Sequence, residues 1–158
     1  MDAKPIIKVV EIPQTKVVSF YALSMHPEEE AYKQAEEYGK PRGLYDNPLY
    51  YQVYGFDNPV RRHKDDTHGR EVWIAVPDDY DTGEGVTVKS FEGGLYAMVS
   101  IKGFIEMDAA WGYLIKWVKN SEEYESGKHQ HLERHVDPSN GDDNTMQLEL
   151  LIPIARRA

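Results

Sequence analysis

The sequence predicts an α+β domain in which a strand-helix-strand-strand unit occurs twice and forms an antiparallel sheet. Two observations lead to this prediction: strand-like and helix-like segments follow one another in the same order in both halves, and two strand-like segments match across the halves. We expect both helices to cover one face of the sheet and the other face to curve into a ligand groove. Residues 1–158 are assigned to one domain, with pseudo-repeats at about 4–76 and 87–154.

The first unit opens with a segment rich in Val and Ile, Lys4–Leu23, whose Pro-Gln-Thr interruption predicts one kinked strand or two short strands. A helix is predicted from Pro27, which suits a first turn, to the stop signal at Gly39. Strands are predicted at Tyr50–Phe56 and Arg70–Val76. The segment thus has the order strand, helix, strand, strand.

The second unit repeats this order. Thr87–Lys102 is strand-like around the interruption Gly93-Gly94, and Glu106–Tyr124 carries apolar residues at helical spacing. Two further strands are predicted at Leu132–Val136 and Met146–Ile154.

Two short matches favour a tandem duplication over chance similarity between β-rich halves. Glu71–Val76 aligns with Glu149–Ile154 at an offset of 78, and Val18-Ser19 aligns with Val99-Ser100 at an offset of 81.

Alternation along a strand places Glu71 and Trp73 on one face and a β-branched core face opposite them. The last strand repeats the pattern and places Glu149 on the corresponding face. The alternative is that both carboxylates are ordinary solvated residues of an open sheet face. The aromatic residues around them favour a groove, because a carboxylate among aromatic rings suits a flat, lipophilic cation. The candidate ligand-binding residues are Glu71, Trp73, Tyr50, Tyr54, Tyr96, Trp111, Tyr113 and Glu149.

Trp111 and Trp117 also have the spacing of core residues on a helix, which is an alternative to a role in ligand binding.

Composition excludes several classes of function. The chain has no cysteine, which rules out disulfides, thiolate metal sites and cysteine nucleophiles. Its net charge of -9 disfavours direct DNA binding, which depends on neutralising phosphates with Lys and Arg. The sequence shows neither a signal peptide nor an apolar run that could span a membrane, so we expect no membrane association and a cytoplasmic location.

No metal and no cofactor are predicted. His129, His131 and His135 lie close together, but their spacing fits a surface cluster better than a metal site. Two acidic, turn-rich segments, at 77–85 and 137–144, do not complete the spacing of a calcium loop.

Nearly the whole chain resembles the GyrI-like small-molecule-binding family, which also occurs as the effector-binding domain of multidrug-sensing and AraC-type activators. Six segments carry the resemblance, in order: VEIPQTKVVSF (10–20), VYGFDNP (53–59), REVWIAV (70–76), GGLYAMVSIKG (93–103), WGYLIKW (111–117) and LELLIPI (148–154).

The resemblance implies a glutamate that faces cationic ligands within an aromatic pocket, and this role maps onto Glu71. It carries over less directly to the aromatic positions. No helix-turn-helix segment precedes the first strand, so we expect a standalone binding protein whose partner is a lipophilic or cationic small molecule. The sequence names no protein partner.

Two other functions stay open. Glu71 and Glu149 could act as acid and base in a hydrolase of reactive small molecules, as some relatives are thought to do. A gyrase-inhibitor type of protein interaction is the third possibility, but the acidic residues are scattered rather than gathered into one patch.

Overall fold

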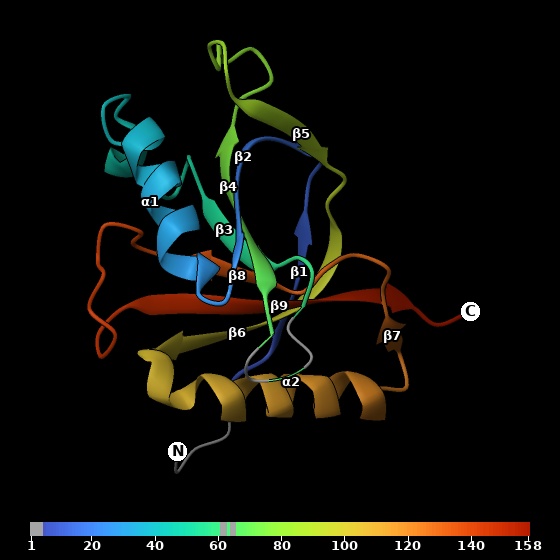
Figure 1. The fold of residues 1–158 in the computed structure, drawn as a ribbon. Helices are drawn as coiled ribbons and strands as arrows, with labels where there is room; N and C mark the ends of the chain where they lie inside the picture. The colour runs from blue at the N-terminus through green and yellow to red at the C-terminus, as the bar shows by residue number, and fades with distance from the viewer. Residues whose placement is uncertain (1–4, 61–62, 64–65) are drawn as a thin grey trace. The chain divides into compact units, whose positions relative to one another are not determined.

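A computed structural model describes residues 5–60, 63 and 66–158 (Figure 1). The helices are α1 (Pro27–Gly39) and α2 (Met107–Asn120), with short 3-10 turns at Leu44–Asp46 and Phe104–Glu106. The strands are β1 (Lys8–Ile12), β2 (Thr15–Ser24), β3 (Val53–Asp57), β4 (His68–Val76), β5 (Thr87–Phe91), β6 (Gly94–Lys102), β7 (Tyr124–Ser126), β8 (Leu132–His135) and β9 (Gln147–Arg156).

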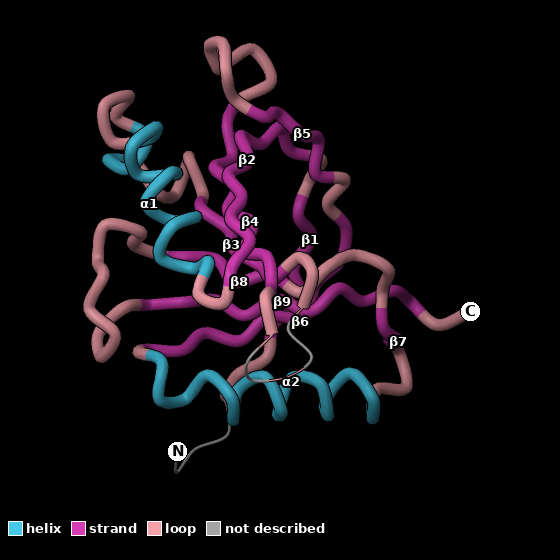
Figure 2. The backbone as a smooth tube through the Cα atoms, viewed as in Figure 1, coloured by secondary structure: helices cyan, strands magenta, loops and turns pink. Residues whose placement is uncertain are grey.

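The strands, which are magenta in Figure 2, pair antiparallel within two compact units. Residues 15–91 form one unit, in which β4 lies between β3 and β2, and β2 also pairs with β5. Residues 1–14 and 92–158 form the other, called here the two-segment unit. In it β9 lies between β8 and β6, and β6 also pairs with β1. The predicted α+β class is confirmed. Each unit contains the order strand, helix, strand, strand, as β2-α1-β3-β4 in one and as β6-α2-β8-β9 in the other, with β5 added to the first unit and β1 and β7 to the second.

Each unit has its own apolar core between its helix and one face of its sheet. In the 15–91 unit, Val72, Ile74 and Val76 of β4 pack with Ala31 and Ala35 of α1. Burial of one such large aliphatic side chain contributes about 1.5–3 kcal/mol. In the two-segment unit, alternate residues of β9 pack with α2 in the same way: Leu148, Leu150, Ile152 and Ile154. Alternation along β4 and β9 therefore places Glu71 and Glu149 on the faces away from the helices.

Helix α1 begins where the sequence predicts. Pro27 is at the first helical position and is followed by three glutamates in the first turn, whose charges favour the positive end of the helix dipole. Gly39 is its last residue, and a Cβ there would collide with the ring of Tyr45. Gly39 thus allows the ring of Tyr45 to pack closely against the end of the helix.

The boundaries differ from the prediction at several places, and three of the differences have a clear local cause or add an element. Tyr50 precedes β3, because the backbone N–H groups of Tyr50 and Tyr51 turn back to the carbonyl of Asn47. Helix α2 ends at Asn120, since Ser121 is extended and its Oγ accepts the N–H of Tyr124. The following short strand, β7, was not predicted and pairs with β9.

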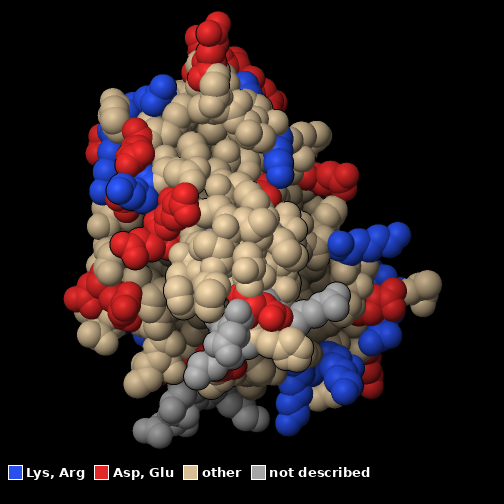
Figure 3. Space-filling view, in the orientation of Figure 1, with Lys and Arg blue, Asp and Glu red and all other residues tan. Residues whose placement is uncertain are grey.

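Figure 3 shows acidic side chains at the top of the view, where the connector between β4 and β5 lies. Four exposed acidic residues lie there: Asp78, Asp79, Asp81 and Glu84. Within the described part of the chain, neither helix has the length and apolar character to cross a membrane.

Candidate functional site

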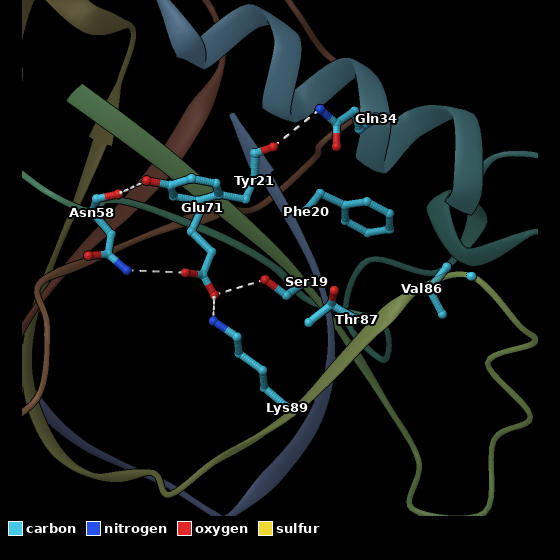
Figure 4. A pocket seen from close by; sticks show the side chains of 10 residues that line it. Ser19, Phe20, Tyr21, Gln34, Asn58, Glu71, Val86, Thr87 and Lys89 are labelled. Carbon is cyan, nitrogen blue, oxygen red and sulfur yellow. Dashed lines mark hydrogen bonds and ion pairs between the residues drawn. The ribbon is translucent and has the colours of Figure 1, made fainter. Parts of the chain in front are cut away.

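The carboxylate of Glu71 is the centre of a buried hydrogen-bond network in the 15–91 unit (Figure 4). Its Oε2 accepts hydrogen bonds from Ser19 Oγ at 2.8 Å, Trp73 Nε1 at 2.6 Å and Lys89 Nζ at 2.8 Å. Its Oε1 accepts a longer one, at 3.4 Å, from Asn58 Nδ2. Glu71 itself is 1% exposed, so the protein has replaced almost all of its hydration.

These partners keep the carboxylate charged. Burial by itself raises the pKa of Glu71, but the hydrogen bonds from Lys89, Trp73 and Ser19 and the positive charge of Lys89 outweigh burial and lower the pKa below its ordinary value. Glu71 is therefore an anion at neutral pH.

Aromatic rings surround the indole that bonds to Glu71. The ring of Trp73 meets Phe56 edge-on at 4.8 Å between centroids and lies 5.2 Å from Phe91. Tyr54, opposite Trp73 in the neighbouring strand, contacts Phe91 at 6.1 Å. This packing holds Trp73 in place, and with it one hydrogen-bond donor to the carboxylate.

A cavity of about 500 Å³ borders Glu71. It lies where β5 stops pairing with β2, because the pairing covers only Thr15–Ser19 of a strand that continues to Ser24. The lining residues are mainly polar but include two aromatic residues: Ser19, Phe20, Tyr21, Gln34, Asn58, Glu71, Gly85, Val86, Thr87 and Lys89. Its size is within the usual range for small-molecule sites.

Lys89 separates Glu71 from solvent. The lysine side chain is 46% exposed and the glutamate side chain only 2%. Asn58 borders the cavity on another side, and its backbone carbonyl accepts a hydrogen bond from the hydroxyl of Tyr21 at 2.7 Å. Glu71 is thus reached through a cavity at the edge of the sheet rather than across an open sheet face.

A glycine allows Asn58 to approach β4 this closely. The N–H of Asn58 donates to the carbonyl of Gly69 at 2.8 Å, and a Cβ on Gly69 would overlap the carbonyl oxygen of Asn58. Gly69 thereby fixes one side of the site.

Of the aromatic candidates in this unit, Tyr54 and Trp73 lie with Glu71 on one sheet face. Tyr50 lies apart from them, in the turn before β3, where it is 58% exposed and meets Tyr51 edge-on. The prediction that Tyr50 lies in a strand, alternating with Tyr54, is wrong, because the turn at Asn47 includes Tyr50 and β3 begins only at Val53.

In the two-segment unit, Tyr96 and Glu149 lie on the sheet face away from α2. Tyr96 is buried, and Glu149 is held by Arg134, whose Nε donates to it at 2.6 Å. Trp111 of α2 is partly buried, packs against the core on the other sheet face and stacks on His131, with 5.6 Å between ring centroids. Tyr113 also belongs to α2 and is half-buried. Trp111 and Tyr113 therefore do not share a sheet face with Glu149.

Sequence reasoning did not identify Ser19, Asn58 and Lys89 as partners of Glu71. In the sequence, Ser19 was noted only because Val18-Ser19 aligns with Val99-Ser100 in the other half of the chain. Alternation along the predicted strand at 87–102 places Lys89 on one face with Thr87 and Phe91, but it does not show which strand is paired alongside.

Among the described residues, one group of three side chains has the arrangement of possible metal ligands: Glu28, Asp57 and His68, with ligand atoms within 4.8 Å of one another. His68 Nε2 lies 2.6 Å from Glu28 Oε1, and Arg70 donates to Asp57 at 3.1 Å. The fixed positive charge of Arg70 opposes a divalent cation here. We interpret the group as an ion-pair network that holds the start of α1 against β3 and β4.

The chain matches the model of the Cass2 family, integron-associated effector binding protein, over residues 8–154, and it belongs to that family. Family membership supports binding of a small molecule. A sequence comparison with curated proteins gives no match.

Solved structures of similar fold include the C-terminal domain of EcmrR, with 17% identity, a TM-score of 0.65 and coverage of 97% of this chain and 99% of that one. A hydrolase from Listeria innocua has 13% identity, a TM-score of 0.66 and coverage of 96% and 93%. SAV2435 bound to tetraphenylphosphonium has 10% identity, a TM-score of 0.52 and coverage of 95% and 94%. At these identities the likeness establishes the fold.

Proposed function

We propose that the chain binds amphipathic or aromatic cations in the cavity beside Glu71. The observation that carries the proposal is a charged, buried carboxylate at the wall of a cavity large enough for a small molecule. A buried anion attracts a cation more strongly than an exposed one does, because less water screens the charge. Tyr21, opposite Glu71 in the neighbouring strand, supplies apolar ring surface beside the carboxylate, and Phe20 also lines the cavity.

The family description supports the proposal, since effector binding is its stated property. The structure of SAV2435 with tetraphenylphosphonium shows that a protein of this fold accepts a lipophilic cation, and it supplies a practical probe.

Catalytic hydrolysis by Glu71 is the less favoured function. General acid or base catalysis works best when the pKa of the group lies near the working pH, whereas the hydrogen bonds and Lys89 lower the pKa of Glu71. A carboxylate of this kind is a weak base and suits ionic recognition better than proton transfer. We therefore expect mass spectrometry to recover bound probes and esters of similar size unchanged after long incubation.

The test is calorimetric titration with tetraphenylphosphonium and with neutral triphenylphosphine oxide. Glu71→Gln should weaken binding of the cation by about tenfold or more and binding of the neutral compound by less than about threefold, because only the cation loses a charge partner. Glu149→Gln is the matched control, and it should leave both affinities unchanged. An equal loss for both compounds in Glu71→Gln would contradict the electrostatic role.

Tryptophan emission gives a second signal for the same titration. The indole N–H of Trp73 donates directly to Glu71. A ligand that perturbs the carboxylate should therefore change the fluorescence of Trp73. Trp73→Phe should remove that change, whereas Trp117→Phe should leave it in place.

A further inference from the structure

Lys89 occupies the position that a bound cation would need. Its ammonium lies 2.8 Å from Oε2 of Glu71, the buried carboxylate that borders the cavity. That oxygen already accepts hydrogen bonds from Ser19, Trp73 and Lys89, so a cationic ligand that pairs with it must take the place of a donor.

We propose that Lys89 is a tethered counter-ion which a cationic ligand displaces, so that Lys89 sets how strongly a cation must interact in order to bind. The proposal rests on the proposed function, since it concerns access to the same carboxylate.

Three features make Lys89 suited to displacement. It lies on the edge strand β5, where four of five residues are exposed, and about half of its side chain is in solvent. Its flexible stem allows the ammonium to return to water at small cost. Lys16 in the same unit is anchored differently, because its ammonium donates to the carbonyls of both Asp78 and Tyr80.

Glu71 keeps its place when Lys89 leaves. Ser19 and Trp73 donate to the same carboxylate oxygen from β2 and β4, and Trp73 is itself fixed by the rings of Phe56 and Phe91. The anion is thus preorganised for a second cation, and an incoming charge replaces the one that is lost.

This exchange favours a particular class of ligand. The tethered ammonium acts as a competitor with a high effective concentration, so a small hydrated cation gains little by replacing it. A cation with large aromatic or aliphatic surface gains in addition from apolar contact within the cavity. We therefore expect selection of lipophilic cations over small amines.

The test compares Lys89→Met with the wild-type protein at about pH 8, so that Glu71 stays ionised without its lysine. Binding of tetraphenylphosphonium should tighten by about tenfold, because the internal competitor is gone. Binding of triphenylphosphine oxide should change by less than about twofold. Lys116→Met, which removes an exposed lysine of α2, is the control for net charge and should have no effect. Lys89→Gln serves as a second variant if Lys89→Met does not fold.

The gain must also depend on Glu71. In the Glu71→Gln background, Lys89→Met should tighten phosphonium binding by less than about twofold, because no anion is left to expose. An unchanged affinity in Lys89→Met, or an equal gain for the cation and the neutral compound, overturns the displacement proposal alone, provided that the wild-type protein binds the cation more tightly than Glu71→Gln does. If neither wild-type protein nor Lys89→Met binds the phosphonium, the proposed function fails and displacement fails with it.

Discussion

Glu71 and Glu149 occupy comparable places in the two units, yet their counter-ions come from different strands. Glu71 lies on β4, between β2 and β3, and Glu149 lies on β9, between β6 and β8. Each carboxylate is on the sheet face away from the helix of its unit. Glu149 is opposite Arg134 of β8, whereas the residue opposite Glu71 in β3 is Phe56. The positive charge at Glu71 is supplied instead by Lys89 of β5.

On our proposal, the difference separates a structural ion pair from an exchangeable one. Arg134 is directly cross-strand from Glu149, its side chain is 17% exposed, and it has a rigid guanidinium. Lys89 is a flexible side chain on an edge strand beside a cavity. An anion with a fixed partner stabilises a sheet, whereas an anion with a removable partner can also bind a ligand.

The largest expected effect is on stability. Arg134→Met should lower the free energy of unfolding by about 3 kcal/mol, because Glu149 would lose its partner in a largely buried position. Lys89→Met should lower it by about 1 kcal/mol, because Ser19 and Trp73 still bond to Glu71. Urea denaturation of both variants measures the two losses, and a larger loss for Lys89→Met would reverse the comparison.

Two serines give a smaller and independent contrast. Ser19 donates to Glu71 at 2.8 Å in the interior, so Ser19→Ala should cost about 1.5 kcal/mol. Ser100 is opposite Glu149 but is exposed, and Ser100→Ala should change stability by less than about 0.5 kcal/mol. Equal losses in thermal or urea unfolding would show that Ser19 adds nothing specific to the carboxylate.

The pH dependence of stability gives the smallest expected difference. Because folding lowers the pKa of Glu71, this residue contributes stability above its unfolded pKa near 4.5, and the contribution is lost as the pH falls through the folded pKa. Wild-type protein should therefore exceed Glu71→Gln in stability at neutral pH, and the gap should narrow below about pH 4.5. A constant gap between pH 3 and pH 7 would contradict a charged Glu71. The pKa of Glu28 is also lowered, but that contribution is present in both proteins and cancels.

Much of the fold could be predicted because local patterns determine it. Alternation in β4 placed Glu71 and Trp73 on the face opposite Val72 and Ile74, and Pro27 marked the start of α1. The start of β3 was missed because the turn at Asn47 depends on backbone hydrogen bonds that residue types alone do not specify.

The site could be predicted only in part. Glu71 was singled out, and the structure places it beside a cavity. Its bond to Lys89 depends on β5 pairing with β2, two strands far apart in the sequence whose register no local pattern gives. The role of Asn58 likewise depends on its close approach to Gly69. Residues that meet through long-range register are the ones that sequence patterns leave undetermined.

A crystal structure of the protein with tetraphenylphosphonium is the most direct test of Glu71 as a binding anion with an exchangeable partner. We expect the phosphonium in the cavity between Tyr21, Asn58 and Glu71, with the ammonium of Lys89 turned into solvent. A phosphonium bound elsewhere, or one bound in this cavity while Lys89 still donates to Glu71, would contradict the exchange.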